Sequence, residues 1–293
     1  LGALRGPVQF IEAGAHDGQL ALDVLRYWRE FQKEVFPRVQ YVILEPSPAR
    51  SARQARKLAD YRGKVRWAKD WGEIGDFRGA CFSNELLDAM PVHVFRWDAP
   101  RQRWREWGVS ESGGALVWRA LDEDQANLCA RPMLAPLPNE LLAVLPDGFT
   151  AEVCPDAIAW WTQAARALRA GWLSTADYGL AQEDFFAPHR SSGTLRAYAR
   201  HRVLGGVLDS PGEQDITSHV NFSQVLAAGE HHGLVTEDCV RQDRFLKRIL
   251  EEIERTPSAF PTWTPARLRQ LATLMHPEQL GRAFQVIVQS KAG

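Results

Sequence analysis

The first part of the chain places a short apolar run ahead of a stretch in which apolar residues recur at helical spacing. The run at 8–11 is rich in β-branched and aromatic residues and is followed by Glu12. Gly14 and Gly18 come next, and from there the apolar positions have the period of an amphipathic helix over 20–36. The pattern predicts a strand, a tight turn and a helix.

The same alternation is repeated along most of the chain. A buried run at 41–44 ends in Glu45 and completes a strand–helix–strand unit. Further helices are expected at 49–58, 138–145, 155–168, 222–228 and 245–254, and further strands at 64–68, 149–154, 171–176, 233–240 and 283–289, with a strand from 80 that runs into a polar turn and a short helix before Pro91. This order predicts an α/β fold with a doubly wound, mostly parallel sheet that binds ligands at the carboxyl ends of its strands.

Two regions interrupt this order. Strands expected at 92–97, 103–109 and 115–120 are joined by turn-rich links and indicate an inserted antiparallel meander. The segment from 193 to 222 is polar and long, which is typical of a lid or binding loop. We therefore expect a single domain over 1–293 with insertions at about 91–147 and 180–222.

Composition narrows the class of protein. The chain has 293 residues, is 45% hydrophobic and carries a net charge of −1, so it can bury a large core and has no overall field that would recruit nucleic acid or an anionic membrane. We expect no membrane span and no signal peptide. The spacing of the four cysteines, at 81, 129, 154 and 239, fits neither a zinc site nor a redox motif, and His231-His232 lacks a nearby third ligand. We predict no metal, buried thiols and a reducing, cytoplasmic location.

The glycine turn indicates which cofactor the first strand serves. A dinucleotide site needs three glycines, but His16 occupies the middle position between Gly14 and Gly18. Glu12 would repel a phosphate, whereas it can accept a hydrogen bond from an ammonium group. S-adenosylmethionine, an adenosine that carries an amino acid, fits this chemistry. The alternative is that the two glycines only form a turn.

Further candidates for cofactor binding follow the next strands. Glu45 is expected to accept hydrogen bonds from ribose hydroxyls, and Asp70 with Trp71 to contact the adenine. Asn84 stands at the same edge of the predicted sheet. The alternatives are a solvated strand end for Glu45 and a packing role for Trp71.

With these residues assembled, the chain resembles the MidA-like family of S-adenosylmethionine-dependent methyltransferases. The motifs that carry the resemblance are Glu12-x-Gly14 to Gly18, 83–93, 177–179, 193–198, 211–222 and 284–291. The resemblance implies a class I (Rossmann-like) methyltransferase fold with an antiparallel last strand. The chain differs from the family at two points. It has His16 where a glycine is usual, and it lacks the opening helical segment with tyrosines. We expect an amino-terminal piece of the longer relatives to be missing.

The mitochondrial relative in this family is an assembly factor of respiratory complex I, which implies methylation of an arginine in a protein partner and a mitochondrial location in a eukaryote. A guanidinium is always charged, so carboxylates must hold it. Glu85 and Asp88 would point the same way on a helical turn and form a fork for it, with Glu152 or Asp177 as a third partner. Alternatively, Asn84 and Asp88 cap the short helix and Glu85 faces water.

Histidines and acids of the polar loop complete the set of candidates. His219 and His201 are candidates for relaying a proton, although loop histidines are more often structural. Glu213 and Asp215 are candidates for binding the substrate chain. The leading hypothesis is a protein arginine methyltransferase. Its alternatives are a small-molecule O- or N-methyltransferase and a catalytically weak assembly or binding module.

Overall fold

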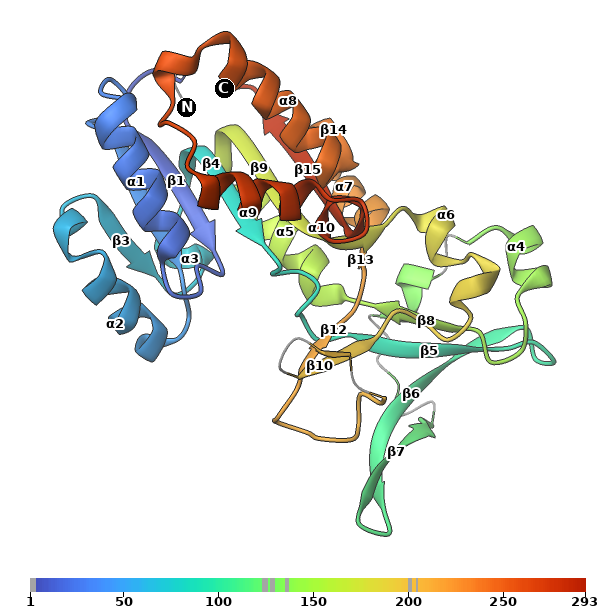
Figure 1. Cartoon of the computed structure of the whole chain (residues 1–293). Helices are drawn as coiled ribbons and strands as arrows, with labels where there is room; N and C mark the ends of the chain where they lie inside the picture. Colours follow the sequence, from blue (N-terminus) through green and yellow to red (C-terminus); the bar gives the residue numbers. More distant parts are fainter. Residues whose placement is uncertain (1–3, 123–125, 127–129, 135–136, 200–201, 204) are drawn as a thin grey trace. The chain divides into compact units, whose positions relative to one another are not determined.

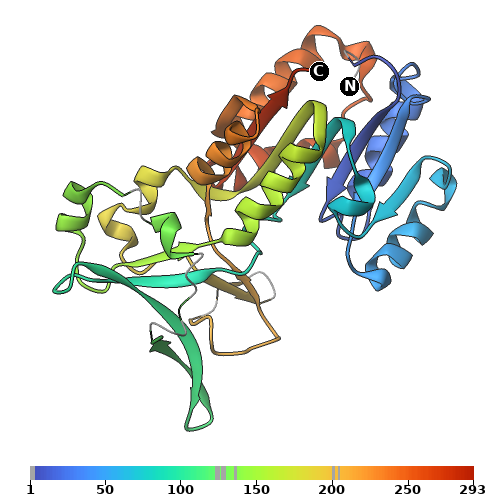
Figure 2. The same ribbon diagram turned by 180° about the vertical axis from the view of Figure 1, so that it is seen from behind.

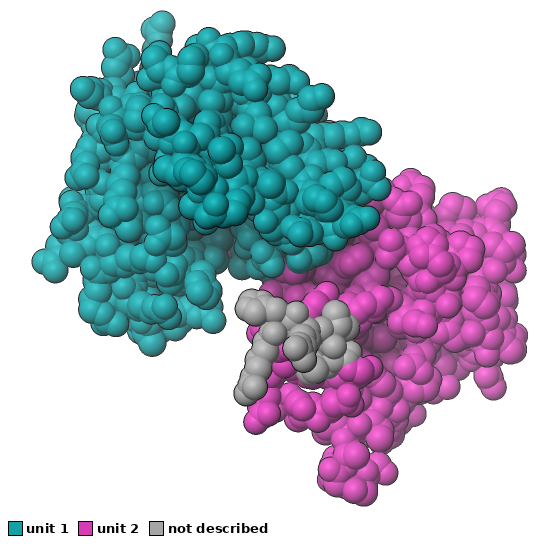
Figure 3. All heavy atoms as spheres, viewed as in Figure 1, with its two compact units in different colours: residues 1–86, 161–178, 226–293 teal, residues 87–160, 179–225 magenta. Residues whose placement is uncertain are grey.

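The structure is a computed structural model that describes residues 4–122, 126, 130–134, 137–199, 202–203 and 205–293. The predictions for Cys129 and His201 lie outside these residues. The chain divides into two compact units, the first formed by 1–86, 161–178 and 226–293, and the second by 87–160 and 179–225 (Figure 3). The prediction of a single domain with insertions stays a prediction. Helices of the described residues fall short of the length and apolar character that crossing a membrane requires.

A mixed sheet forms the centre of the first unit (Figure 1). Its strand order is β14-β15-β9-β4-β1-β2-β3. The strands are β1 (Val8–Ala13), β2 (Val39–Leu44), β3 (Val65–Ala68), β4 (Phe77–Asn84), β9 (Leu168–Leu180), β14 (Val235–Arg241) and β15 (Phe284–Lys291). Strands β9, β4, β1, β2 and β3 run parallel, and β15 is antiparallel to both of its neighbours. The prediction of a mostly parallel sheet with an antiparallel last strand is confirmed.

Helices cover both faces of this sheet. They are α1 (Gln19–Phe31), α2 (Pro48–Lys57), α3 (Trp71–Ile74), α5 (Pro155–Ala167), α7 (Phe222–His231), α8 (Gln242–Arg255), α9 (Pro265–Met275) and α10 (Leu280–Ala283). Val286 of β15 packs in one cluster with Phe245 of α8, whereas Gln289 accepts a hydrogen bond from Trp161 of α5. Because side chains alternate along a strand, α8 and α5 lie on opposite faces, and α5 is in front in the reverse view (Figure 2).

Packing explains where α1 forms. Ala21, Leu25 and Trp28 lie on one helical face and are buried against the β1–β2 strands. The helix ends at Phe31, so the predicted end at 36 is wrong: turns occupy 33–38 ahead of β2. Helices α9 and α10 were not predicted.

The segment after β4 corrects one local prediction. Residues 85–90 are bends and turns, so the expected short helix is wrong. Glu85 has a φ of 48° and donates its backbone N–H to the carbonyl of Ala176, 3.0 Å away, which diverts the chain from a helical path. Glu85 and Asp88 therefore do not share a helical face.

The second unit contains a four-stranded antiparallel sheet in the order β7-β6-β5-β8. Its strands are β5 (His93–Asp98), β6 (Arg103–Ser112), β7 (Ala115–Ala120) and β8 (Thr150–Val153), and the helix α4 (Asn139–Val144) precedes β8. Phe95, Trp97, Trp104 and Phe149 are central to the core of this unit. The predicted meander is confirmed, and β8 extends it.

The second predicted insertion contains short regular elements. They are α6 (Gln182–Phe185), β10 (Arg196–Ala199), β11 (Arg202–Val203), β12 (Asp215–Thr217) and β13 (Val220–Asn221). Strands β10, β11 and β12 form a small antiparallel sheet, and β13 pairs with the end of β9. Much of this segment is therefore held by strand pairing.

Cysteine burial differs from one residue to the next. Cys81 is buried, and burial raises the pKa of its thiol. Cys154 is half-buried and Cys239 is exposed. The expectation of a buried thiol is wrong for Cys239, because β14 is the edge strand of its sheet.

Candidate active site

The strand register of the first unit aligns the carboxyl ends of three strands. Ala13 on β1 pairs with Leu44 on β2 and with Ser83 on β4. Glu12, Glu45 and Glu85 stand within two residues of these positions. The structure thus brings three predicted acids to one edge of the sheet, where ligands bind in open parallel sheets.

The glycine turn connects β1 to α1 through left-handed backbone. Gly14 and Gly18 have φ values of 76° and 82°, which glycine adopts without strain. A Cβ on Gly14 would already stand at 3.4 Å from the side chain of Leu86. The side chain of His16 is 89% exposed, so its bulk stays outside the turn. Its carbonyl accepts a hydrogen bond of 3.0 Å from Gln54.

Glu12 is a buried acid held by a tyrosine that the sequence analysis missed. The hydroxyl of Tyr41 donates to Oε2 of Glu12 over 2.6 Å. Burial raises the pKa of Glu12 to about 6, although this hydrogen bond acts in the opposite direction. Glu12 is still mostly ionised at pH 7. A carboxylate offers about four acceptor positions, so it can accept from a ligand as well.

Glu45 is held at the tip of β2 by hydrogen bonds from residues of the helix that follows, α2, and of its N-terminal cap. The backbone N–H of Ser47 donates to Oε1 over 2.9 Å, and Gln54 donates to Oε2 over 3.3 Å. The amide oxygen of Gln54 accepts from the indole of Trp67 over 2.9 Å. Gln54, which the sequence analysis also missed, therefore orients Glu45 and the glycine turn together.

Asp70 and Trp71 have structural partners. Oδ1 of Asp70 accepts from the backbone N–H of Glu73 over 3.0 Å and caps α3. Trp71 is buried, with its ring stacked on Phe77 at a centroid distance of 6.3 Å. These contacts agree with the packing alternative for Trp71, and the adenine contacts stay a prediction.

Asn84 and Glu85 form the exposed tip of β4. The amide of Asn84 donates to Oε1 of Glu85 over 3.1 Å. Just after them, the backbone N–H of Leu86 donates to Oδ2 of Asp177 over 3.2 Å. Asp177 is fully buried, and its other oxygen accepts from Tyr178 over 2.9 Å. Asp177 thus fixes the backbone that follows Glu85.

Asp88 and His219 belong to the second unit. Ser218, the residue before His219, donates its N–H to the carbonyl of Asp88 over 3.0 Å, and Asp88 is buried. Burial and the positive charges of Arg190 and Arg196 lower the pKa of His219 to about 4, so its imidazole is neutral at pH 7. The fork of Glu85 with Asp88 stays a prediction.

Glu152 anchors the motif at 193–198. Its carboxylate accepts from the N–H of Thr194 at 2.9 and 3.0 Å, from the hydroxyl of Thr194 at 2.9 Å and from the N–H of Leu195 at 3.4 Å. The hydroxyl of Thr194 accepts in turn from the N–H of His219 over 3.1 Å. These bonds link Glu152 to His219.

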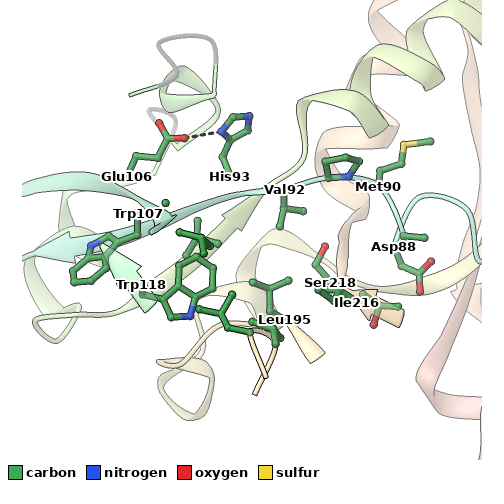
Figure 4. A pocket seen from close by; sticks show the side chains of 18 of the residues that line it. Asp88, Met90, Val92, His93, Glu106, Trp107, Trp118, Leu195, Ile216 and Ser218 are labelled. Carbon is green, nitrogen blue, oxygen red and sulfur yellow. Dashed lines mark hydrogen bonds and ion pairs between the residues drawn. The ribbon is translucent and has the colours of Figure 1, made fainter. Parts of the chain in front are cut away.

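The second unit also contains a pocket of about 470 Å³ (Figure 4). Its walls are largely apolar, and Asp88, Thr217 and Ser218 are among its polar lining residues. Figure 4 shows His93 and Glu106 bonded to each other on the far side of the strand from Trp118 and Leu195. This volume is in the range of ligand sites.

The donor set of the first unit fits S-adenosylmethionine. Glu12 suits the ammonium group, Glu45 suits a ribose diol, and the glycine turn allows close approach to bare backbone. Among the residues that the structure describes, His, Cys, Asp and Glu do not gather in any group of three that would hold a metal.

Comparisons with known proteins show which family the chain belongs to. The profile of a family of S-adenosyl-L-methionine-dependent methyltransferases matches residues 1–240. A protein arginine methyltransferase, mitochondrial NDUFAF7 of Mus musculus, is 25% identical over 94% of this chain and 65% of its own length. The Homo sapiens protein is 27% identical over 75% of this chain and 47% of its own length. The chain thus spans less than two thirds of these relatives.

A solved structure is also similar. It is a candidate methyl transferase from Burkholderia thailandensis bound to S-adenosyl-homocysteine, with a TM-score of 0.79 and 28% identity over 97% of this chain and 72% of that one. The family match covers most of the chain, and the fold and the acids of the first unit suit the same cofactor. This chain belongs to the MidA-like family of S-adenosylmethionine-dependent methyltransferases.

Proposed function

We propose that this protein transfers the methyl group of S-adenosylmethionine to a guanidinium nitrogen of an arginine in a protein partner. The observation that carries the proposal is Glu85, an exposed carboxylate at the tip of β4 with a φ of 48°. Non-glycine residues in this conformation persist where the surroundings hold them, often at functional sites. The names of the mouse and human relatives support an arginine acceptor.

An arginine acceptor needs a carboxylate because the guanidinium is protonated at every physiological pH. A carboxylate on one side draws the positive charge to the nitrogens that it contacts and leaves another nitrogen free to attack. When bound, the cofactor supplies a methyl group on a sulfonium. The new N–C bond forms as the C–S bond breaks, the sulfur leaves as a thioether, and the acceptor nitrogen then loses a proton.

The roles in the first unit follow from the contacts of each side chain. Glu12 binds the ammonium group, Glu45 binds the ribose, and Gly14 and Gly18 keep the backbone open. Asn84 orients Glu85 through its side-chain amide. Asp70 and Trp71 are retained as candidates for the adenine side of this site on sequence grounds alone, since their observed contacts are a helix cap and packing on Phe77.

In the second unit, Asp88 contributes negative charge toward the acceptor, and His219 accepts the released proton. The imidazole of His219 is neutral at pH 7, and no described residue hydrogen bonds to its Nδ1; its pKa of about 4 makes it a weak base that would pass a proton on rather than hold it. Glu152 acts through the 194–195 backbone as a positioning residue.

The test incubates the full chain with methyl-tritiated S-adenosylmethionine and protein extract from host cells that lack this protein. We expect label in methylarginine after acid hydrolysis. Glu85→Gln should lower this rate about 100-fold or more, the range of a lost charged catalytic group. It should keep its affinity for S-adenosylhomocysteine, measured by calorimetry, because Glu85 lies outside the cofactor contacts.

Glu30→Gln, on the exposed face of α1, is the matched control and should retain full activity. Label in another amino acid, or retained turnover in Glu85→Gln, would contradict the arginine mechanism. The 470 Å³ pocket favours a small-molecule acceptor as the second candidate. The same incubation with a small-molecule extract of these cells tests this candidate, and label recovered only from that extract would support it. If the protein binds S-adenosylmethionine but transfers no methyl group to either extract, the result would support an assembly module.

A further inference from the structure

The pocket of the second unit has one wall made of cross-strand pairs. Val94 of β5 pairs with Trp107 of β6, and Val109 of β6 pairs with Trp118 of β7. Directly paired residues point to the same face of a sheet, so these four side chains form one apolar surface. In Figure 4, Trp118 lies next to Leu195 on this side of the strand.

A second wall comes from the segment that the sequence analysis described as a polar loop. Leu195, Val207, Leu208 and Ile216 all line the pocket. Ile216 is 44% exposed and Val109 is 48% exposed. Large apolar side chains that line a concave surface and remain in water are typical of a binding site for an apolar group.

The acids Asp88 and Glu106 line the pocket, and Arg196 lies beside it, paired with Thr217. The described lining residues include neither lysine nor arginine. The segment 205–218, which contributes three of the apolar residues, carries Asp209, Glu213 and Asp215 and no basic residue. Arg96 of β5 is stacked over Trp107, 3.9 Å from the ring centroid. The acids of the lining suit a basic group in a partner segment, and its apolar walls suit an apolar side chain.

The pocket is close in sequence to Glu85, the residue proposed to hold the acceptor arginine. Asp88, at the pocket, follows Glu85 by three residues. A protein segment that presents an arginine to Glu85 combines a basic group with neighbouring side chains. The charge and the apolar walls of the pocket are complementary to such a segment.

We propose that this pocket binds a large apolar side chain of the protein segment that carries the acceptor arginine. The inference rests on the proposed function and adds a sequence requirement to it. The pocket would select substrates with a leucine-like or aromatic residue at a fixed distance from the arginine. Specificity then depends on the second unit, whereas cofactor binding depends on the first.

The test uses the full chain, saturated with S-adenosylhomocysteine, and fluorescein-labelled peptides of glycine and serine with one central arginine. A leucine is moved through each of the other positions, and the dissociation constant is measured by anisotropy. We expect leucine at one or two adjacent positions to tighten binding about tenfold, the gain from burying one such side chain. Trp118→Ala and Ile216→Ser should abolish this gain.

Trp263→Ala is the matched control, because Trp263 is an exposed tryptophan of the first unit, and it should keep the gain. Each variant is compared by its thermal unfolding and its affinity for S-adenosylhomocysteine, so that misfolding is separated from lost recognition. The pocket assignment would be overturned if leucine tightened binding at none of the positions, or if Trp118→Ala kept the tighter binding.

The two proposals fail in different ways. Methylarginine formed at equal kcat/KM in every peptide, with methyl-tritiated cofactor, would uphold arginine transfer and overturn the pocket. A positional gain in binding that Trp118→Ala removes, without methylarginine in any peptide, would support the apolar site and overturn arginine transfer.

Discussion

Glu12 and Glu152 are both buried carboxylates, but different groups satisfy them. Glu152 accepts from two backbone N–H groups and a hydroxyl, all within 194–195, as an anchor for that segment does. The hydrogen bond that Glu12 accepts comes from the phenol of Tyr41. Burial raises the pKa of both acids. An acid with one neutral donor keeps more of its acceptor capacity for a cationic ligand.

Glu12 makes the stability of the ligand-free protein depend on pH. Its pKa rises from 4.5 to about 6 on folding, so the folded state binds the proton more tightly. The resulting stability is present below pH 4.5 and is lost as the pH rises through 6. Between pH 4 and 7, wild type should lose about 2 kcal/mol more of its free energy of unfolding than Glu12→Gln does.

Urea unfolding across this pH range measures the difference. Glu30→Gln, exposed on α1, should follow the wild-type curve. Parallel curves for wild type and Glu12→Gln would show that the carboxylate is not destabilised by burial.

At the scale of elements, Gly193 lies in the segment that follows α6 and packs against Thr150 and Glu152 of β8. Its φ is 76°, and an added Cβ would overlap Oε1 of Glu152. Gly193→Ala should cost about 2–4 kcal/mol, since backbone strain adds to the displacement of Glu152. Gly212→Ala is the matched control, with a φ of 85° and open space around the new Cβ, and should cost about 1 kcal/mol.

Chemical denaturation of both variants measures these costs. Gly193→Ala should also weaken methyl transfer, because the Glu152–Thr194 bonds hold His219. Equal costs for the two glycines would contradict the anchoring role of Glu152.

The buried strands of the first unit could be predicted because they are apolar and are followed by polar residues. The turn after β4 could not: the local sequence Glu-Leu-Leu-Asp favours a helix, but the bonds to Ala176 and Asp177 come from about 90 residues away. Helix α9 did have a local signal, since Thr264 caps it and Pro265 is its first residue.

The placement of the acids could be predicted because parallel strands end at one edge. Their partners could not. Tyr41 reaches Glu12 and Gln54 reaches Glu45 only through the register and packing of β1, β2 and α2. The pocket of the second unit was not predicted either, since its walls combine strands β5–β7 with residues about 100 positions later.

At the scale of the whole molecule, cofactor binding is assigned to the first unit. S-adenosylhomocysteine should therefore slow amide hydrogen exchange at 13–18 and 45–47, because binding suppresses local opening of the segments that it contacts. Exchange in the second-unit sheet, 93–120, should change less. Mass spectrometry of exchange with and without ligand checks this, and protection confined to 93–120 would contradict it.

The hydrogen bond between Leu86 and Asp177 has a consequence for sequence variation among relatives of this protein. The chain leaves the first unit after Leu86 and again after Tyr178, and the carboxylate of Asp177 bonds to the backbone at both departures. A substitution that removes the carboxylate of Asp177 would remove the hydrogen bonds to the backbone of Leu86 and of Tyr178 together. Among related sequences, an aspartate at this position should therefore be conserved even where the neighbouring residues of β9 vary.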